Sequence, residues 1–524
     1  MTDDRGQMTE ETKQTNDKEK KKKRFSKDYI WTFTTYFTEG FPYIIIRTVS
    51  SVFFRDMKVS LEAIGLVNLF GLPWVLKFLW GPWVDEYSTK RRWLLTMQSI
   101  MLVILAVTAF VVPLKNSIQV IAALFFAGAF IAATHDIAID GYYMEALDKE
   151  GQAKFVGYRT MAYRVAMMTG TGLIVTISAA VGWFLGFLAG AVIFGLFFLY
   201  HIFYLKEVET ERKKIKVLLL RALRLKPLLF VSILVIVVIA IRYFFQSPVY
   251  LQLKEQLPLL KKIRFAHWIA LLLLIIMVLV GFFRKRIKAV IMRDPESHYS
   301  RAFLYFMERD KVSLILAFII LLRIGEWTLA TMVAPFMVDL GVKIHYGWIS
   351  AAVGLPASIV GAMLGGWMIS RFSLKKVMWP FILAQNFTNI LFMALAHHLA
   401  TFIEINTGAA EPVGIGSFNL VLVAATHGFD QFAGGLATAV LMTYLMRICH
   451  QEFKAAHYAI GTALMNISAI FSGVASGLIA GWLGYAWLFG LSFVFSIPAM
   501  LLIPFLPYVS DNEKRPPGHE GTKE

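Results

Sequence analysis

Long runs of apolar residues are the feature that most restricts what this chain can fold into. Stretches such as Ile100–Val112 and Phe184–Leu199 contain hardly any polar side chain. A helix needs ~20 mostly apolar residues to cross the ~30 Å hydrocarbon layer of a membrane. Only 17% of the 524 residues are charged, whereas soluble globular chains carry about 25%. The sequence therefore excludes a soluble enzyme and a disordered chain, and it predicts a polytopic membrane protein.

Charged interruptions divide the apolar sequence into fourteen predicted helices. Six are predicted at 29–54, 61–84, 93–113, 117–139, 155–180 and 182–205, and the last six at 312–334, 347–370, 377–402, 416–446, 457–480 and 485–508. Two more, at 228–246 and 266–283, lie between these groups. We therefore predict an all-α membrane protein with two six-helix halves and two inserted helices.

Positive charge is concentrated in the predicted connections on one side of the membrane. The connections 206–227 and 284–311 are rich in Lys and Arg, and the opposite loops hold far fewer. Because basic residues accumulate in cytoplasmic loops, we expect both termini in the cytoplasm. The same bias explains the net charge of +17 without nucleic acid as a partner. The basic connection 247–265 breaks this rule, so an alternative has the two inserted helices lying along the membrane and only twelve helices crossing it.

This organisation predicts five segments. They are a disordered cytoplasmic tail over 1–28, an N-terminal six-helix half over 29–205, a basic cytoplasmic linker with the two extra helices over 206–311, a C-terminal half over 312–508 and a cytoplasmic tail over 509–524. The first segment contains Lys20–Lys23 and no hydrophobic signal-peptide core. A single cysteine, Cys449, excludes an intramolecular disulfide and a cysteine-based metal cluster. We expect no metal and no cofactor.

The two halves repeat each other. Gly71-Leu72-Pro73 recurs as Gly354-Leu355-Pro356, 283 residues later, and Asp56 matches Asp339 at the same offset. The segments 81–88 and 366–373, and also 133–135 and 425–427, correspond in the same order. Two halves in one orientation with a basic linker are typical of parallel-repeat secondary transporters. No Walker-type phosphate loop or nucleophile elbow occurs, so we expect neither ATP as the energy source nor an enzyme.

The end of the second predicted helix carries a motif for gating. Its pattern Gly81-x-x-x-Asp85, followed by Lys90, Arg91 and Arg92, resembles the G-x-x-x-D-R-x-G-R-R loop of the major facilitator superfamily. A small residue permits close helix approach, and basic residues anchor to the inner leaflet. We predict that Gly81, Asp85, Arg91 and Arg92 form a conformational gate. The alternative is an ordinary positively charged cytoplasmic loop.

Carboxylates inside the predicted helices are candidates for proton coupling, because unpaired charge is costly in lipid and a desolvated carboxylate can take up a proton near neutral pH. Asp136 and Asp140 lie four residues apart and share one helix face. Arg159 and Arg164 on the next helix are natural partners, and a static ion pair is an equal alternative to a transport role. The full set of candidates is Glu39, Asp136, Asp140, Glu326 and Asp430.

Other polar residues inside the helices are candidates for substrate binding. Arginine binds an anionic group bidentately. The set comprises Arg47, Arg164, Arg323, Gln385, Asn386 and Asn389. Lys77 has the same kind of position, but we expect its side chain to extend toward the cytoplasmic interface.

Several of these motifs resemble the AmpG-type muropeptide permeases. They are the segments 38–43, 76–85 and 134–141, and in the second half 442–449 with 455–459. The resemblance covers about 33–505 and implies fourteen spans. It also implies an inner-membrane symporter that imports anhydro-muropeptides with protons. Related acetyl-coenzyme A transporters share the 76–85 and 134–141 motifs about as well.

The expected partners are therefore a small anionic substrate, protons and the lipid bilayer. We expect a monomer. Two alternatives stay open at this point: transport of acetyl-coenzyme A or another organic anion, and a sensor or scaffold that has lost transport. The charged residues predicted inside both halves argue against the scaffold, because charge inside a membrane costs free energy and is usually kept for a function.

Overall fold

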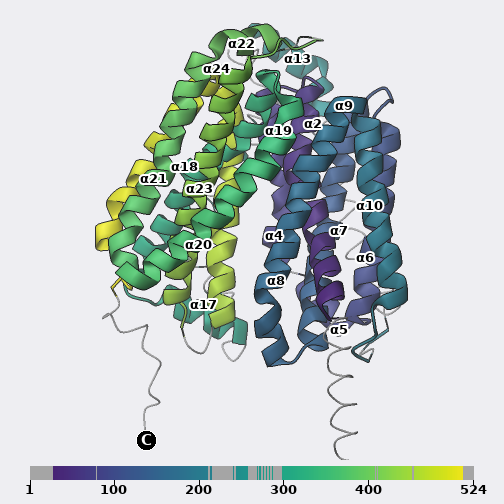
Figure 1. Ribbon diagram of the computed structural model, residues 1–524, viewed down its shortest axis with the longest axis vertical. Coiled ribbons are helices and arrows are strands. Elements are labelled where there is room, and N and C mark those ends of the chain that lie inside the picture. Colours follow the sequence, from purple (N-terminus) through teal and green to yellow (C-terminus); the bar gives the residue numbers. More distant parts are fainter. Residues whose placement is uncertain are drawn as a thin grey trace, which may run out of the picture. The chain divides into compact units, whose positions relative to one another are not determined.

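A computed structural model describes residues 28–77, 80–210, 213–214, 243–257, 298–407, 411–450 and 454–510, with isolated positions at 409 and between 240 and 289. Apart from one isolated bridge between Tyr87 and Lys213, the regular structure in these ranges is helical (Figure 1). The prediction of an all-α protein is therefore confirmed. The two predicted inserted helices, at 228–246 and 266–283, lie mostly outside the described residues, so the prediction of fourteen spans stays a prediction.

The first half of the chain begins with a helix over 28–44. It continues through η1 (Ile45–Val49) into α2 (Ser50–Asp56). The following elements are α3 (Leu61–Gly65), η2 (Leu66–Gly71), α4 (Leu72–Leu76), α5 (Gly81–Glu86), α6 (Lys90–Val111), α7 (Ser117–Ala146), α8 (Lys149–Met168), η4 (Thr169–Ile174), α9 (Val175–Val181) and α10 (Trp183–Tyr204). The segments η1 and η4 are π-helical turns, which occur often at functional sites.

Two short helices, α13 (Pro248–Gln256) and α17 (His298–Met307), precede the second half. That half contains α18 (Val312–Asp339), α19 (Lys343–Trp348), η5 (Ile349–Gly354), α20 (Leu355–Phe372), α21 (Leu374–His398), α22 (Ala400–Asn406), α23 (Ser417–Arg447), α24 (Lys454–Leu502) and η6 (Ile503–Phe505). α24 contains a break at Gly484, whose φ is 79°. Glycine has no Cβ and tolerates this conformation, so the chain reverses there between the two helices predicted at 457–480 and 485–508.

Eight helices of the described residues are long and apolar enough to cross a membrane. Many large apolar side chains lie exposed on them; for example, Phe203 is 76% exposed and Met363 71%. Apolar surface of this extent needs a non-aqueous environment. The protein is therefore a multi-pass membrane protein.

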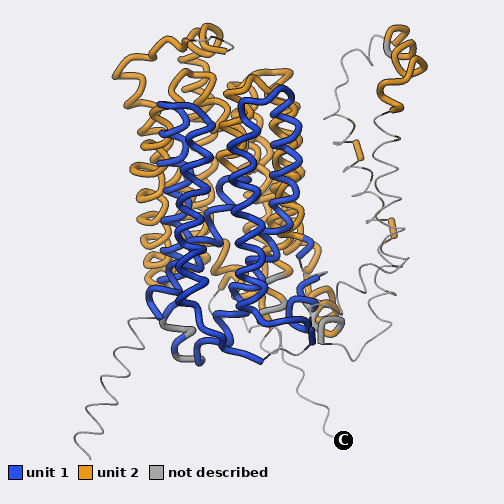
Figure 2. Tube along the Cα trace, turned by 90° about the vertical axis from the view of Figure 1, so that its right-hand side faces the viewer, with its two compact units in different colours: residues 1–46, 76–219 blue, residues 47–75, 220–524 orange. Residues whose placement is uncertain are grey.

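The described chain divides into two compact units (Figure 2). Unit 1 comprises residues 1–46 and 76–219, and unit 2 comprises 47–75 and 220–524. In unit 1, α6 packs against α7 and against α10. In unit 2, α18 packs against α24, and α20 and α21 pack against α23 (Figure 1). The segment 47–75 therefore packs with the second half of the chain, in unit 2.

Glycines permit the close helix contacts of unit 2. A Cβ on Gly65 would lie 2.8 Å from the carbonyl oxygen of Gly473, and one on Gly477 would lie 2.6 Å from that of Leu61. This contact fixes α3 against α24. Small residues let helix backbones approach in membranes, where van der Waals packing contributes much of the association free energy.

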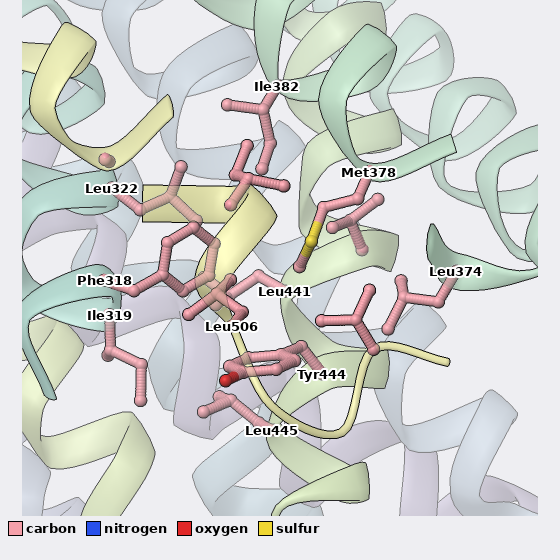
Figure 3. Close-up of a cluster of buried hydrophobic side chains, with 14 of the residues drawn as sticks. Phe318, Ile319, Leu322, Leu374, Met378, Ile382, Leu441, Tyr444, Leu445 and Leu506 are labelled. Carbon is pink, nitrogen blue, oxygen red and sulfur yellow. The ribbon is translucent and has the colours of Figure 1, made fainter. Parts of the chain in front are cut away.

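An apolar cluster fills the interior of unit 2 near the ends of α18, α21 and α23 (Figure 3). Phe318, Met378 and Tyr444 converge there, and Leu506, which directly follows η6, packs against them. The rings of Phe318 and Tyr444 meet edge to face with centroids 5.5 Å apart. Such packing fixes the helices that carry the polar residues described next.

Candidate transport site

Unit 1 holds a group of polar and charged residues from the helix over 28–44, the end of α4, α7 and α8. We call this group the unit 1 cluster: Tyr36, Glu39, Lys77, Asp136, Asp140 and Arg159. Lys77 forms an ion pair with Asp136, whose side chain is 9% exposed. Tyr36 donates a 2.8 Å hydrogen bond to Oδ1 of Asp140. Arg159 lies 3.3 Å from the same oxygen. The spacing of Asp136 and Asp140 thus places both carboxylates in one network, and each has its own cation.

Glu39 adds a third carboxylate to this cluster. It interacts electrostatically with Asp136, Asp140 and Lys77, and its Oε2 is buried without a hydrogen-bond partner. Three carboxylates therefore share two cations, Lys77 and Arg159. In a membrane interior such a surplus charge is expensive unless a proton or a cation neutralises it.

Arg164 lies one turn and a half beyond Arg159 on α8. It forms no ion pair or hydrogen bond within the part of the chain that the structure describes. Arg47, in contrast, donates a 2.8 Å hydrogen bond to the carbonyl oxygen of Asn68. A Cβ added to Gly71 would lie only 2.3 Å from Nη1 of Arg47 and would collide with the guanidinium. The glycine of the repeated 71–73 motif is therefore needed to accommodate Arg47.

Unit 2 contains a polar pocket with a volume of about 130 Å³, which we call the unit 2 pocket. Its polar lining residues are Glu326, Ser358, Gln385, Asn389, Asp430, Gln431 and Thr438. α18, α20, α21 and α23 all contribute to it. Four of the residues selected from the sequence, Glu326, Gln385, Asn389 and Asp430, are brought together here.

Two other selected residues of this half have different surroundings. Arg323 forms an ion pair with Glu326 one turn away and lies over the ring of Trp327, 5.5 Å from the centroid. Asn386 donates a 2.8 Å hydrogen bond to the carbonyl oxygen of Ile382 within its own helix. Arg323 is therefore already neutralised, and Asn386 does not line the pocket.

The predicted gating residues lie at the end of α5 and the start of α6. Asp85 is 3.0 Å from Nζ of Lys90 and is 62% exposed. Arg91 donates a 2.6 Å hydrogen bond to the carbonyl oxygen of Leu205 at the end of α10. The ion pair of Arg92 with Glu207 is longer, at 3.6 Å, and exposed. The motif thus joins its loop to the end of α10 within unit 1. A Cβ added to Gly81 would meet its nearest side-chain atom only at 4.0 Å, so packing does not require a glycine there.

A second group of charges joins the end of α2 to the end of α18, and we call it the α2–α18 clamp. Arg55 donates two hydrogen bonds of 2.6 Å to Asp339, and Tyr485 donates a third of 2.6 Å to the same carboxylate. Lys343 lies 2.7 Å from Asp56. The repeat-related aspartates Asp56 and Asp339 therefore each bind a base from the opposite half of the sequence.

Sequence reasoning missed four residues of these groups: Tyr36, Arg55, Lys343 and Tyr485. Lys77 does not extend toward the interface as expected but pairs with Asp136. The repeat offers a signal for the clamp, because Asp56 and Asp339 match at one offset and each has a basic residue within four positions. In the described residues no group of three or more His, Cys, Asp or Glu is arranged to hold a metal.

Membrane-spanning helices with buried charges in two compact units are typical of transporters. Residues 30–294 and 315–524 match the model of the Major Facilitator Superfamily. The chain therefore belongs to the Major Facilitator Superfamily, a class of membrane transporters.

Within this class, the chain is similar to AmpG-type proteins. It is 22% identical to the anhydromuropeptide permease of Escherichia coli strain K12 over 89% of its own length and 77% of the permease. It is also 22% identical to a putative AmpG transporter of Rickettsia felis over 89% and 93% of the two chains. The resemblance stated from the sequence is thus confirmed.

Solved structures of transporters share the fold. A crystal structure of the peptide transporter POT in complex with sulfate superposes with a TM-score of 0.58 at 11% identity, and covers 91% of this chain and 94% of that one. The nucleoside transporter NupG gives a TM-score of 0.55 at 13% identity, with 91% and 97% covered. The predicted major-facilitator fold is therefore confirmed.

Proposed function

We propose that this chain is a proton-coupled importer of anhydro-muropeptides or similar anionic cell-wall fragments. It works in the cytoplasmic membrane as a monomer by alternating access, with both termini in the cytoplasm. The observation that carries the proposal is the unit 1 cluster, in which three carboxylates share two cations. The similarity to the E. coli anhydromuropeptide permease supports the class of cargo.

The unit 1 cluster is suited to hold one exchangeable proton. Lys77 and Arg159 each neutralise one aspartate, so the surplus negative charge rests with Glu39, whose Oε2 has no partner. Protonation of Glu39 removes that surplus, and deprotonation restores it. Because the groups facing Glu39 are the two aspartates, Lys77, Arg159 and Tyr36, a change at any of them alters its proton affinity.

Arg164 is suited to bind an anionic group of the cargo. It is a cation of unit 1 without a carboxylate among the described residues, and its planar guanidinium matches a carboxylate bidentately. Arg47 is less available, because Asn68 accepts one of its hydrogen bonds. We therefore propose Arg164, in preference to Arg47, as the residue that binds the carboxylate of the cargo.

The α2–α18 clamp supports the alternating-access part of the proposal. In the orientation expected from the sequence, it lies at the external end of both helices. Its ion pairs would stabilise the state that is closed to the outside, and they would have to separate when the transporter opens outward. Gly81, Asp85, Arg91 and Arg92 would act at the cytoplasmic end.

Uptake into proteoliposomes tests the proposal. We expect a labelled anhydro-muropeptide to accumulate when the outside is acidic, and we expect a protonophore to abolish the accumulation. Accumulation that survives the protonophore contradicts proton coupling. Uptake of acetyl-coenzyme A in place of the muropeptide would favour the second class of cargo, and no flux of either would favour a scaffold.

A further inference from the structure

The unit 2 pocket carries one negative charge more than its cations neutralise. Glu326 is paired with Arg323. Asp430 accepts hydrogen bonds only from neutral groups, the hydroxyl of Thr388 at 2.7 Å and the amide of Gln431 at 3.2 Å. No cation pairs with Asp430 among the residues that the structure describes. A buried carboxylate without a cation is unstable unless a ligand or a proton compensates it.

Asn389 gives a second, independent sign of a ligand. Its side chain is 3% exposed and lines the same pocket. Its Nδ2 is buried and donates to no acceptor in the described structure. A buried donor is normally satisfied, so this amide is left available for an oxygen of a bound molecule.

The pocket has room for part of a cargo. Its volume is about 130 Å³, and a cavity needs about 10–15 Å³ measured in this way to hold one water molecule. One functional group of a cargo therefore fits in it. A group with a positive charge and a neighbouring oxygen satisfies Asp430 and Asn389 together.

We propose that the unit 2 pocket binds a primary ammonium group flanked by a carboxylate or carbonyl oxygen, with the ammonium at Asp430 and the oxygen at Asn389. Gln385, Gln431 and Ser358 line the remaining walls and offer further hydrogen bonds. This is the chemistry of an amino-acid end of a peptide. The inference rests on the proposed function, because it assigns one subsite to the same cargo.

The test compares two probes on the purified full-length protein. One is an anhydro-muropeptide whose peptide ends in a free amine beside a carboxylate, and the other is the same compound acetylated at that amine. We expect acetylation to weaken binding about tenfold or more, since loss of a charge-assisted pair is worth at least ~1.4 kcal/mol. In Asp430→Asn the two probes should bind alike. Glu404→Gln, an exposed carboxylate on α22, should discriminate as the parent does.

Asn389→Ala provides a second variant in case Asp430→Asn does not fold. It should weaken the amine probe about tenfold and still prefer it over the acetylated one. Equal binding of both probes by the parent overturns the subsite but leaves the proposed function standing. Discrimination that persists in Asp430→Asn also overturns it, because the amine is then recognised elsewhere. Binding of neither probe contradicts the subsite and the proposed function together.

Discussion

Arg55 donates two hydrogen bonds of 2.6 Å to Asp339, although 284 positions separate the two residues in the sequence. Both side chains are largely buried, at 11% and 5% exposure. The pair is therefore a buried ion pair that joins the end of the first membrane helix to the end of its counterpart in the second half.

Removal of Arg55 should destabilise the protein. In Arg55→Ala, Asp339 stays buried with Tyr485 as its remaining partner. Breaking a buried ion pair in this way costs about 3–5 kcal/mol, so the thermal unfolding temperature should fall. The charge-exchanged variant R55D/D339R should recover part of the loss. An unchanged unfolding temperature in Arg55→Ala contradicts a structural role for the α2–α18 clamp.

Substitution of two adjacent glycines on α23 by alanine should change the stability of the protein in opposite ways. A Cβ on Gly435 would lie 2.3 Å from the carbonyl oxygen of Ser358, whereas one on Gly434 meets nothing within 4 Å. Gly435→Ala should separate α20 from α23 and cost about 1–3 kcal/mol. Gly434→Ala should be neutral or stabilising by up to ~1 kcal/mol. Thermal unfolding in detergent measures both, and equal effects would contradict the packing described.

Lys77 should be coupled energetically to Asp136. Lys77→Met leaves a mostly buried carboxylate without its cation, and we expect a loss of about 1–3 kcal/mol, because the lysine is itself a third exposed. Lys77→Met combined with Asp136→Asn should cost less than the sum of the single changes. Additive losses in thermal unfolding would mean that the two side chains do not interact.

Arg164 should determine affinity for the anionic group of the cargo. Arg164→Gln should raise the KM for uptake of an acidic cargo about tenfold or more, as loss of a charged hydrogen bond predicts. An analogue whose carboxylate is replaced by an amide should be transported equally by the parent and the variant. If the variant affects both cargoes alike, Arg164 does not bind the carboxylate.

The sequence allowed the fold to be predicted well and the site in part. Helix positions follow from apolar runs, and the pairing of Asp140 with Arg159 follows from their places on consecutive helices. The pairs Lys77–Asp136 and Arg55–Asp339 join residues far apart in the chain. Their contact depends on how helices pack, which local spacing does not encode. The same holds for Asn386, which lies beside Gln385 in sequence but bonds within its own helix.

The central claim is that the surplus carboxylate of the unit 1 cluster carries the coupled proton. The most direct test is a comparison of pH-driven uptake with cargo exchange at equal pH in proteoliposomes containing Glu39→Gln, which is permanently neutral. Glu145→Gln is the matched control, because Glu145 is an exposed carboxylate on α7. We predict that Glu39→Gln retains exchange and loses accumulation driven by the pH gradient, while Glu145→Gln retains both. Full accumulation in Glu39→Gln would contradict the claim.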